Sequence, residues 1–234
     1  MRPELEVAVD APVGAAVHAL GVSRLELCAD LASDGLTPDD GMVRATRRAF
    51  PGTLSVMVRV KPGPFTANSA ELELMLTTIA NLRGLGVDAL VLGLLGTDNQ
   101  LDREKVARCI HAAGPVPVTF HRAFDRVADP LATAQELVAL GVRSLLTSGG
   151  APTAMLGRGT LETLVLAAAE GRAPAILAGG GIRAAEAAQL ARINGLAVIH
   201  RSGLSNGSLD HQGLVDTLAA IAKHAGGKSG SSSA

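Results

Sequence analysis

Eight short runs of β-branched or leucine-rich residues recur along the 234-residue chain, each followed by a segment with helix-like composition. The runs recur about every 27 residues, a pattern typical of parallel strands buried between helices. They cover residues 5–9, 24–28, 54–59, 89–95, 116–122, 144–149, 173–180 and 197–203. Eight strand–helix repeats predict an α/β fold with one domain, a (β/α)8 TIM barrel, whose usual length is about 250 residues. A doubly wound open sheet is the alternative.

Helix start signals stand between the runs. Asn68 or Ser69 ahead of Glu71, and Asp129 ahead of Pro130, have N-cap and first-turn chemistry. The expected helices cover residues 13–20, 41–49, 69–84, 101–112, 130–140, 160–170, 183–193 and 212–224. We expect one barrel domain over residues 1–225 and a disordered Gly/Ser tail over residues 226–234.

Composition narrows the classes of partner. Lys plus Arg number 21 against 22 Asp plus Glu, and the chain has no Trp, no Tyr and four Phe. Such a chain lacks both the positive field and the aromatic platforms of nucleic-acid binders. No uninterrupted apolar stretch of about 18 residues predicts a membrane span, and we expect no signal peptide. Two cysteines cannot form a disulfide framework, so we expect a cytoplasmic protein. With nucleic acids and membranes set aside, the expected partner is a small molecule or a metal ion.

Polar residues interrupt the predicted strands where a barrel places its active site, at the carboxyl ends. Strand alternation turns one set of ionisable side chains toward the barrel interior. This set comprises Glu6, Asp10, Glu26, Arg59, His121 and His200, with Arg122 and Asp125 close behind. Buried charges are costly unless paired, which leaves two interpretations: a structural ion pair such as Glu26 with Arg59, or a catalytic site.

His121 is the strongest candidate for a general acid or base, because its unperturbed pKa of about 6.5 suits proton transfer near neutrality. Asp125, four residues later, could orient its ring. A structural histidine is the alternative.

Glycine-rich strand ends predict an anion-binding rim. Backbone N–H groups in such loops bind phosphate, and glycine permits close approach. The candidate anion-binding residues are Gly179, Gly180, Gly181, Ser202, Gly203, Arg122 and Ser148. The alternative is that the glycines only form tight turns.

Cys28 is a candidate soft-metal ligand, because thiolate and thioether select Cu(I) and Met57 is predicted to face inward on the adjacent strand. The alternative is an inert buried thiol. No HExxH, CxxC or DxDxDG spacing occurs in the chain.

Taken together, these residues resemble the CutC family of copper homeostasis proteins. The resemblance is carried by LEVAVD (5–10), SRLELC (23–28), SDGLTPDDG (33–41), VMVRVKPGPF (56–65), TFHRAFD (119–125), LTSGG (146–150), AGGGI (178–182) and IHRSG (199–203). It implies a cytoplasmic TIM barrel, a homodimer or higher homo-oligomer, and Cu(I) as cofactor with Cys28 matching the family's cysteine. Where family members commonly read RPRGGDF, this chain reads RVKPGPF, so Lys61 replaces an arginine and Pro64 an aspartate.

Three functional hypotheses follow. In the first, the protein takes part in copper homeostasis, with Cys28 as the candidate Cu(I) contact and His121 or Met57 as a helper. In the second, it is an enzyme acting on a small anionic metabolite, including phosphorylated ones, in which Glu26 and His121 move protons while Arg59 and Arg122 neutralise charge; Glu6, Asp125 and His200 complete its catalytic set. The third is a noncatalytic scaffold.

Overall fold

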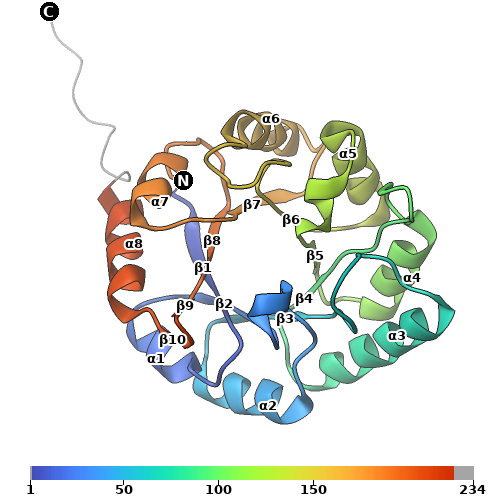
Figure 1. Cartoon of the computed structure of the whole chain (residues 1–234), viewed down its shortest axis with the longest axis horizontal. Coiled ribbons are helices and arrows are strands. Elements are labelled where there is room, and N and C mark those ends of the chain that lie inside the picture. Colours follow the sequence, from blue (N-terminus) through green and yellow to red (C-terminus); the bar gives the residue numbers. More distant parts are fainter. Residues whose placement is uncertain (1, 224–234) are drawn as a thin grey trace, which may run out of the picture.

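The chain folds as a closed barrel of eight parallel strands surrounded by helices (Figure 1). The computed structural model describes residues 2–223, so the expected tail at 226–234 lies outside the described residues. The strands follow one another around the barrel in chain order, and β8 pairs with β1 to close it. The predicted (β/α)8 fold is therefore confirmed, and the open sheet is not formed.

Each strand that the sequence predicts is present. The strands are β1 (Glu4–Val9), β2 (Arg24–Leu27), β3 (Thr53–Met57), β4 (Ala89–Leu92), β5 (Val118–Phe120), β6 (Ser144–Thr147), β7 (Ala175–Gly179) and β8 (Val198–Ser202). The helices are α1 (Gly14–Ala19), α2 (Asp40–Ala49), α3 (Ser69–Gly84), α4 (Arg103–Ala113), α5 (Pro130–Leu140), α6 (Arg158–Ala169), α7 (Ala184–Leu190) and α8 (His211–Lys223).

Local sequence sets the helix ends. Asn68 and Glu71 form a reciprocal capping box at the start of α3, and Asp129 caps α5 ahead of Pro130. Gly141 ends α5 in the left-handed conformation, with φ of 92°. These contacts satisfy backbone groups that a helix end leaves without partners.

Strand alternation separates the core from the site. Leu5, Val7 and Val9 of β1 belong to the main apolar core outside the barrel wall, whereas Glu6 and Ala8 face the interior. Two small apolar clusters, one of Cys28, Met57 and Val91 and one of Leu146, Leu177 and Val198, share that interior with the polar side chains. Full burial of each large apolar side chain stabilises the fold by about 1.5–3 kcal/mol.

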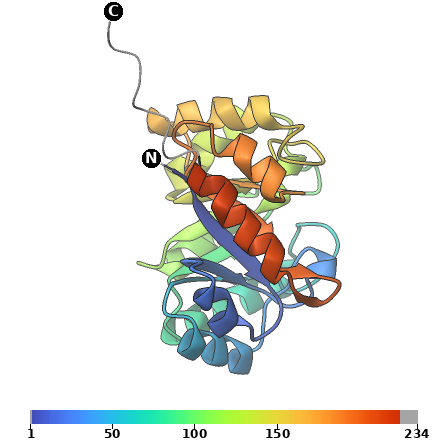
Figure 2. The same ribbon diagram turned by 90° about the vertical axis from the view of Figure 1, so that its left-hand side faces the viewer.

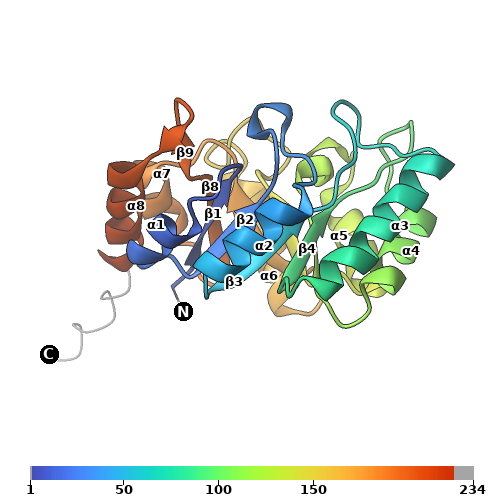
Figure 3. The ribbon, with the colours of Figure 1, turned by 90° about the horizontal axis from the view of Figure 1, so that it is seen from below.

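Additional segments follow the carboxyl ends of the strands. They are the 3-10 helices η1 (Leu31–Ser33) and η2 (Arg122–Arg126) and the hairpin of β9 (Leu204–Ser205) and β10 (Ser208–Leu209). The hairpin rises on the side of the barrel opposite the N-terminus (Figure 3). Asn206 and Gly207 at its turn both have positive φ, 51° and 75°, as a two-residue hairpin turn requires.

The helices form the outer wall, where α8 packs beside α7 (Figure 2). Among the helices of residues 2–223, none is both long enough and apolar enough to cross a membrane.

Candidate active site

A cavity of about 810 Å³ opens at the carboxyl ends of the strands. Its walls carry acids, imidazoles, guanidinium groups and glycines from strands and loops distant in the sequence. Among the lining residues are Glu26, His121, His200, Arg122, Arg126, Arg183, Gly180 and Gly181. The cavity lies where enzymes with this fold place their active sites.

Glu6, Glu26 and His200 meet inside the barrel through the register of β1, β2 and β8, and Glu26 and His200 line the cavity. Glu6 lies beside His200 across β1 and β8, and Glu26 lies beside Ala8 across β1 and β2. His200 Nδ1 is 3.1 Å from Glu6 Oε1 and 3.8 Å from Glu26 Oε2. Glu6 also accepts hydrogen bonds from Arg24 at 3.0 Å and Ser55 at 3.4 Å. We call Glu6, Glu26 and His200 the acid–base array.

Burial and mutual charge separate the pKa values in the array. Burial, with a smaller contribution from Glu6, raises the pKa of Glu26 to about 7. Burial opposes the charged imidazole of His200, but Glu26 and Glu6 outweigh it and raise the pKa of His200. Burial also opposes ionisation of Glu6, yet His200 and Arg24 lower the pKa of that carboxyl. Glu26 Oε2 is buried and has no hydrogen-bond partner within residues 2–223.

The array is charge-balanced by groups of the chain itself. Its donor atoms lie within 4.8 Å of one another, a separation that would also suit a shared metal ion. The Arg24 guanidinium already neutralises Glu6 at 3.0 Å, and a cation added to the array would meet its repulsion. The geometry therefore favours carboxyl groups that share a proton with an imidazole.

His121 reaches the cavity but does not contact Asp125 as expected. Its Nδ1 accepts a hydrogen bond from the Ala123 amide at 3.1 Å, and its ring packs on Phe65 with centroids 4.9 Å apart. Burial, reinforced by the charge of Arg59, lowers the pKa of His121 to about 3. The ring is thus neutral, with its proton on Nε2, and fits the role of a hydrogen-bond donor rather than the expected general base.

Arg59 does not pair with Glu26. Its guanidinium donates to the backbone carbonyls of Ser33 at 2.6 Å, Gly35 at 3.1 Å and Gly63 at 2.9 Å. It thereby joins the loops that follow β2 and β3, and it is not among the residues lining the cavity. Arg59 was expected to neutralise the charge of a substrate. In the structure its guanidinium instead holds these two loops together.

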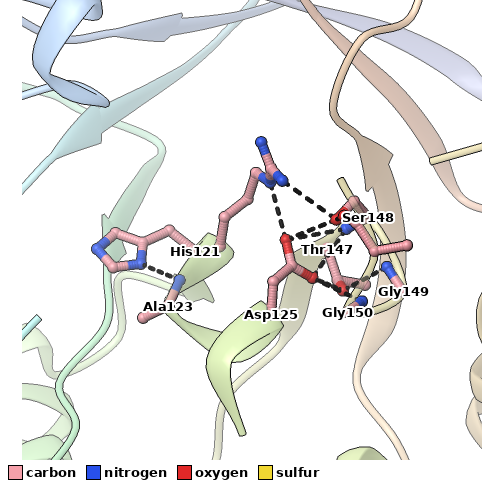
Figure 4. A network of polar contacts seen from close by, with 9 residues as sticks. His121, Ala123, Asp125, Thr147, Ser148, Gly149 and Gly150 are labelled. Carbon is pink, nitrogen blue, oxygen red and sulfur yellow. Dashed lines mark hydrogen bonds and ion pairs between the residues drawn. The ribbon is translucent and has the colours of Figure 1, made fainter. Parts of the chain in front are cut away.

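Asp125 forms a hydrogen-bonded network with the loop after β6 (Figure 4). Its carboxylate accepts from Arg122 Nε at 2.8 Å, the Ser148 amide at 3.0 Å, the Ser148 hydroxyl at 2.9 Å and the Gly150 amide at 3.1 Å. It also accepts from the Thr147 hydroxyl. We call Arg122, Asp125, Thr147, Ser148 and Gly150 the Asp125 network. Ser148, expected to bind a ligand anion, instead binds this internal carboxylate.

Of the glycines predicted to bind an anion, some line the cavity and others pack inside the barrel wall. Gly180 and Gly181 line the cavity, as does Ser202. A Cβ on Gly179 would lie 2.6 Å from Leu146 Cδ1, and one on Gly203 would lie 2.4 Å from Val7 Cγ1. Gly179 and Gly203 therefore permit packing of the barrel wall, the structural role left open by the sequence.

The soft donors Cys28 and Met57 lie in one apolar cluster with Val91. The Cys28 thiol is fully buried and contacts the Val9 carbonyl as a donor at 3.5 Å. Burial, together with neighbouring carboxylates, raises the pKa of Cys28, and only the thiolate binds metal well. One protonated thiol and one thioether do not fit a resident Cu(I) ion.

Sequence reasoning missed several residues at the mouth. Arg126 and Arg183 line the cavity, and so do Leu204 and Ser205 of the hairpin. The Asn-Gly pair at residues 206–207 was the available signal for that hairpin. Lys61, in the altered loop, points to Glu71 of α3, with Nζ 2.7 Å from Oε1.

The fold and cavity define a (β/α)8-barrel protein with a polar pocket that combines carboxyl, imidazole and guanidinium groups. The CutC family model matches residues 4–205, and the chain belongs to the CutC family. A Mesorhizobium japonicum protein named as a CutC family protein is 38% identical over 205 residues, 87% of this chain and 79% of the relative. A Klebsiella pneumoniae counterpart is 41% identical over 165 residues, 70% of this chain and 66% of the relative.

A solved structure from Streptococcus agalactiae, described as a candidate copper homeostasis protein CutC, superposes with a TM-score of 0.75. It is 28% identical in sequence, and the match covers 86% of this chain and 98% of that one. The resemblance found in the sequence motifs is thus confirmed. The homo-oligomeric state and cytoplasmic location that the resemblance implies stay predictions.

Proposed function

We propose that the protein is an enzyme that transfers protons on a small anionic metabolite bound in the barrel mouth. The observation that carries this proposal is the buried Glu26 carboxyl, which lines the cavity with one oxygen unpartnered among the described residues, beside the Glu6–His200 pair. Unpaired buried carboxyl oxygens are costly for stability, and such groups concentrate at catalytic sites.

Each member of the array has a distinct role. Glu6 is held by Arg24 and Ser55 and orients His200 through Nδ1, which leaves Nε2 to exchange a proton with the ligand. Near neutral pH, His200 is the proton donor and ionised Glu26 the proton acceptor. Carboxyl and imidazole groups with pKa values near the working pH suit general acid–base catalysis.

Cationic groups support an anionic ligand. Arg122 and Arg126 of η2 and Arg183 of the loop after β7 line the same cavity, and Gly180 and Gly181 bring backbone close to its wall. The neutral His121 ring offers an additional donor for an oxygen that gains charge during the reaction.

A metabolite screen tests the proposal. The purified full chain is incubated with a small-molecule extract of bacterial cells, and mass spectrometry compares the extract with one treated by the variant Glu26→Gln/His200→Gln. The proposal predicts compounds depleted or formed only by the wild-type protein. Identical profiles from wild type and variant would contradict it.

Copper homeostasis is the role attached to the family name, and family membership supports it for this chain. Cu(I) binding is a second candidate function that rests on this membership, because the neighbouring Cys28 and Met57 do not by themselves fit a resident ion. A Cu(I) titration with a competing chelator tests it. Loss of binding in Cys28→Ser would support it, and unchanged affinity would rule out Cys28 as a ligand.

A further inference from the structure

Arg122 is held at the cavity along one side of its guanidinium group. Nε donates to Asp125 at 2.8 Å and Nη2 donates to Ser148 Oγ at 3.1 Å. These two nitrogens form one side of the planar fork, so the end formed by Nη1 and Nη2 keeps its remaining N–H groups. Within residues 2–223, Nη1 of Arg122 makes no hydrogen bond, and the side chain is 41% exposed.

The group that holds Arg122 is itself fixed. The Asp125 side chain is 9% exposed and accepts hydrogen bonds from Thr147, Ser148 and Gly150 of the loop after β6. Asp125 belongs to η2 after β5, so its carboxylate joins two neighbouring loops. Hydrogen bonds from Arg122, the Thr147 hydroxyl and the Ser148 and Gly150 amides leave this carboxylate little freedom to move.

A third loop also packs against the Arg122 guanidinium. Gly180, after β7, has φ of 109°, a conformation that other residues rarely adopt. A Cβ added there would lie 3.3 Å from Arg122 Cζ and 3.1 Å from Ser148 Cβ. The guanidinium therefore packs closely against the Gly180 backbone, and a side chain there would crowd it.

We propose that Asp125 is a positioning residue that fixes Arg122 so that the Nη1–Nη2 end of its guanidinium binds one oxyanion group of the ligand. Two parallel N–H groups match two oxygens of a carboxylate or phosphate. The inference rests on the proposed function for the identity of the ligand as a substrate, and adds where its anionic group sits. Arg122 lines the same cavity as Glu26 and His200, so an anionic group bound there would share that cavity with the acid–base array.

Phosphate binding tests the inference without requiring turnover. Inorganic phosphate is titrated into the full chain by isothermal calorimetry, and acetate in a parallel arm. We expect Arg122→Gln and Asp125→Asn to weaken binding of the preferred anion about 10- to 100-fold, the effect of one lost charge-assisted hydrogen bond. Tighter phosphate binding assigns a phosphorylated ligand, and tighter acetate binding a carboxylated one.

Three matched variants separate this inference from the others. Arg108→Gln on α4 removes the same charge far from the mouth and should change affinity less than threefold. Glu26→Gln and His200→Gln each alter a charge in the same cavity and so shift the anion affinity, but they should retain measurable anion binding even where catalysis is lost. If these variants bind the anion but the metabolite screen shows no turnover by the wild type, the proposed function is wrong, whereas the inference about Arg122 and Asp125 still stands.

A spectroscopic readout distinguishes positioning from general stability. The Arg122 Nε–H group should give a resolved ¹H–¹⁵N signal in the wild type and lose it in Asp125→Asn, with Ser148→Ala as the milder variant should the former not fold. The inference is overturned by absence of anion binding up to about 10 mM, by unchanged affinity in Arg122→Gln, or by Arg122→Gln weakening binding while Asp125→Asn and Ser148→Ala do not.

Discussion

The two sides of the barrel mouth solve the problem of buried charge in opposite ways. On the β1–β2–β8 side, the acid–base array keeps a buried carboxyl oxygen of Glu26 without a partner among the described residues. On the β5–β6–β7 side, the Asp125 network satisfies its carboxylate with several donors. In our proposal the incompletely paired Glu26 carboxyl exchanges protons, whereas the fully hydrogen-bonded Asp125 carboxylate holds an arginine in position.

The largest expected effect is the loss of catalysis in His200→Gln. The change removes proton exchange while keeping side-chain size, so turnover of the substrate found in the metabolite screen should fall about 10²- to 10⁴-fold. His111→Gln on the exposed part of α4 is the matched control. Turnover within threefold of wild type would place the chemistry outside the array.

His121 should behave as a neutral structural group despite lying at the mouth. Its pKa is lowered to about 3, so the unfolded chain takes up a proton below pH 6.5 that the folded chain does not. The free energy of unfolding should thus fall as pH drops, by roughly 3 kcal/mol between about pH 6.5 and pH 4 at about 1.4 kcal/mol per unit. Urea unfolding of wild type and His121→Asn measures it; equal pH dependence in both would contradict the neutral ring.

Glu26 should have the opposite effect to His121: its contribution to the free energy of unfolding should decrease as pH rises. Its pKa is raised to about 7, so the contribution is present below the ordinary carboxyl pKa and is lost as pH rises through about 7. Between about pH 5 and pH 8, the contribution of Glu26 to the free energy of unfolding of the wild type should decrease by roughly 2–3 kcal/mol. Glu26→Gln should flatten this dependence, although the raised pKa of His200 adds a loss in the same direction. If Glu26→Gln shows the same pH dependence of the free energy of unfolding as the wild type, the contrast between the acid–base array and the Asp125 network is wrong.

The smallest effect concerns the glycine that supports Arg122. Gly180→Ala should cost about 1–3 kcal/mol of folding free energy, because a positive φ is strained for alanine and its Cβ meets Arg122 and Ser148. Gly63→Ala is the matched control, since Gly63 also has positive φ but no atom near its added Cβ. Thermal unfolding of both variants measures the difference. Equal losses would show that the contact with Arg122 carries no energy.

Sequence periodicity predicted the barrel because each strand and each helix has a recognisable local sequence pattern. The alternation of Leu5, Glu6 and Val7, for example, was enough to assign faces. It could also predict that Glu6, Glu26 and His200 approach one another, since carboxyl ends of parallel strands share one edge.

Pairing within the site could not be read from the sequence. Asp125 stands four residues after His121, yet the 3-10 turn directs it toward Thr147 and Ser148 in a later loop. Arg59 reaches backbone carbonyls of two loops whose conformations no local pattern specifies. Such choices depend on tertiary contacts, and they decide which charged group remains available to a ligand.

A carboxyl titration of Glu26 tests the central claim most directly. The protein is labelled with ¹³Cδ-glutamate, the Glu26 signal is assigned by its absence in Glu26→Gln, and its shift is followed with pH. The account predicts a midpoint near 7 for this carboxyl. A midpoint near the ordinary value of about 4.3 would contradict it, because an ordinary carboxylate there could not share a proton with His200 at neutral pH.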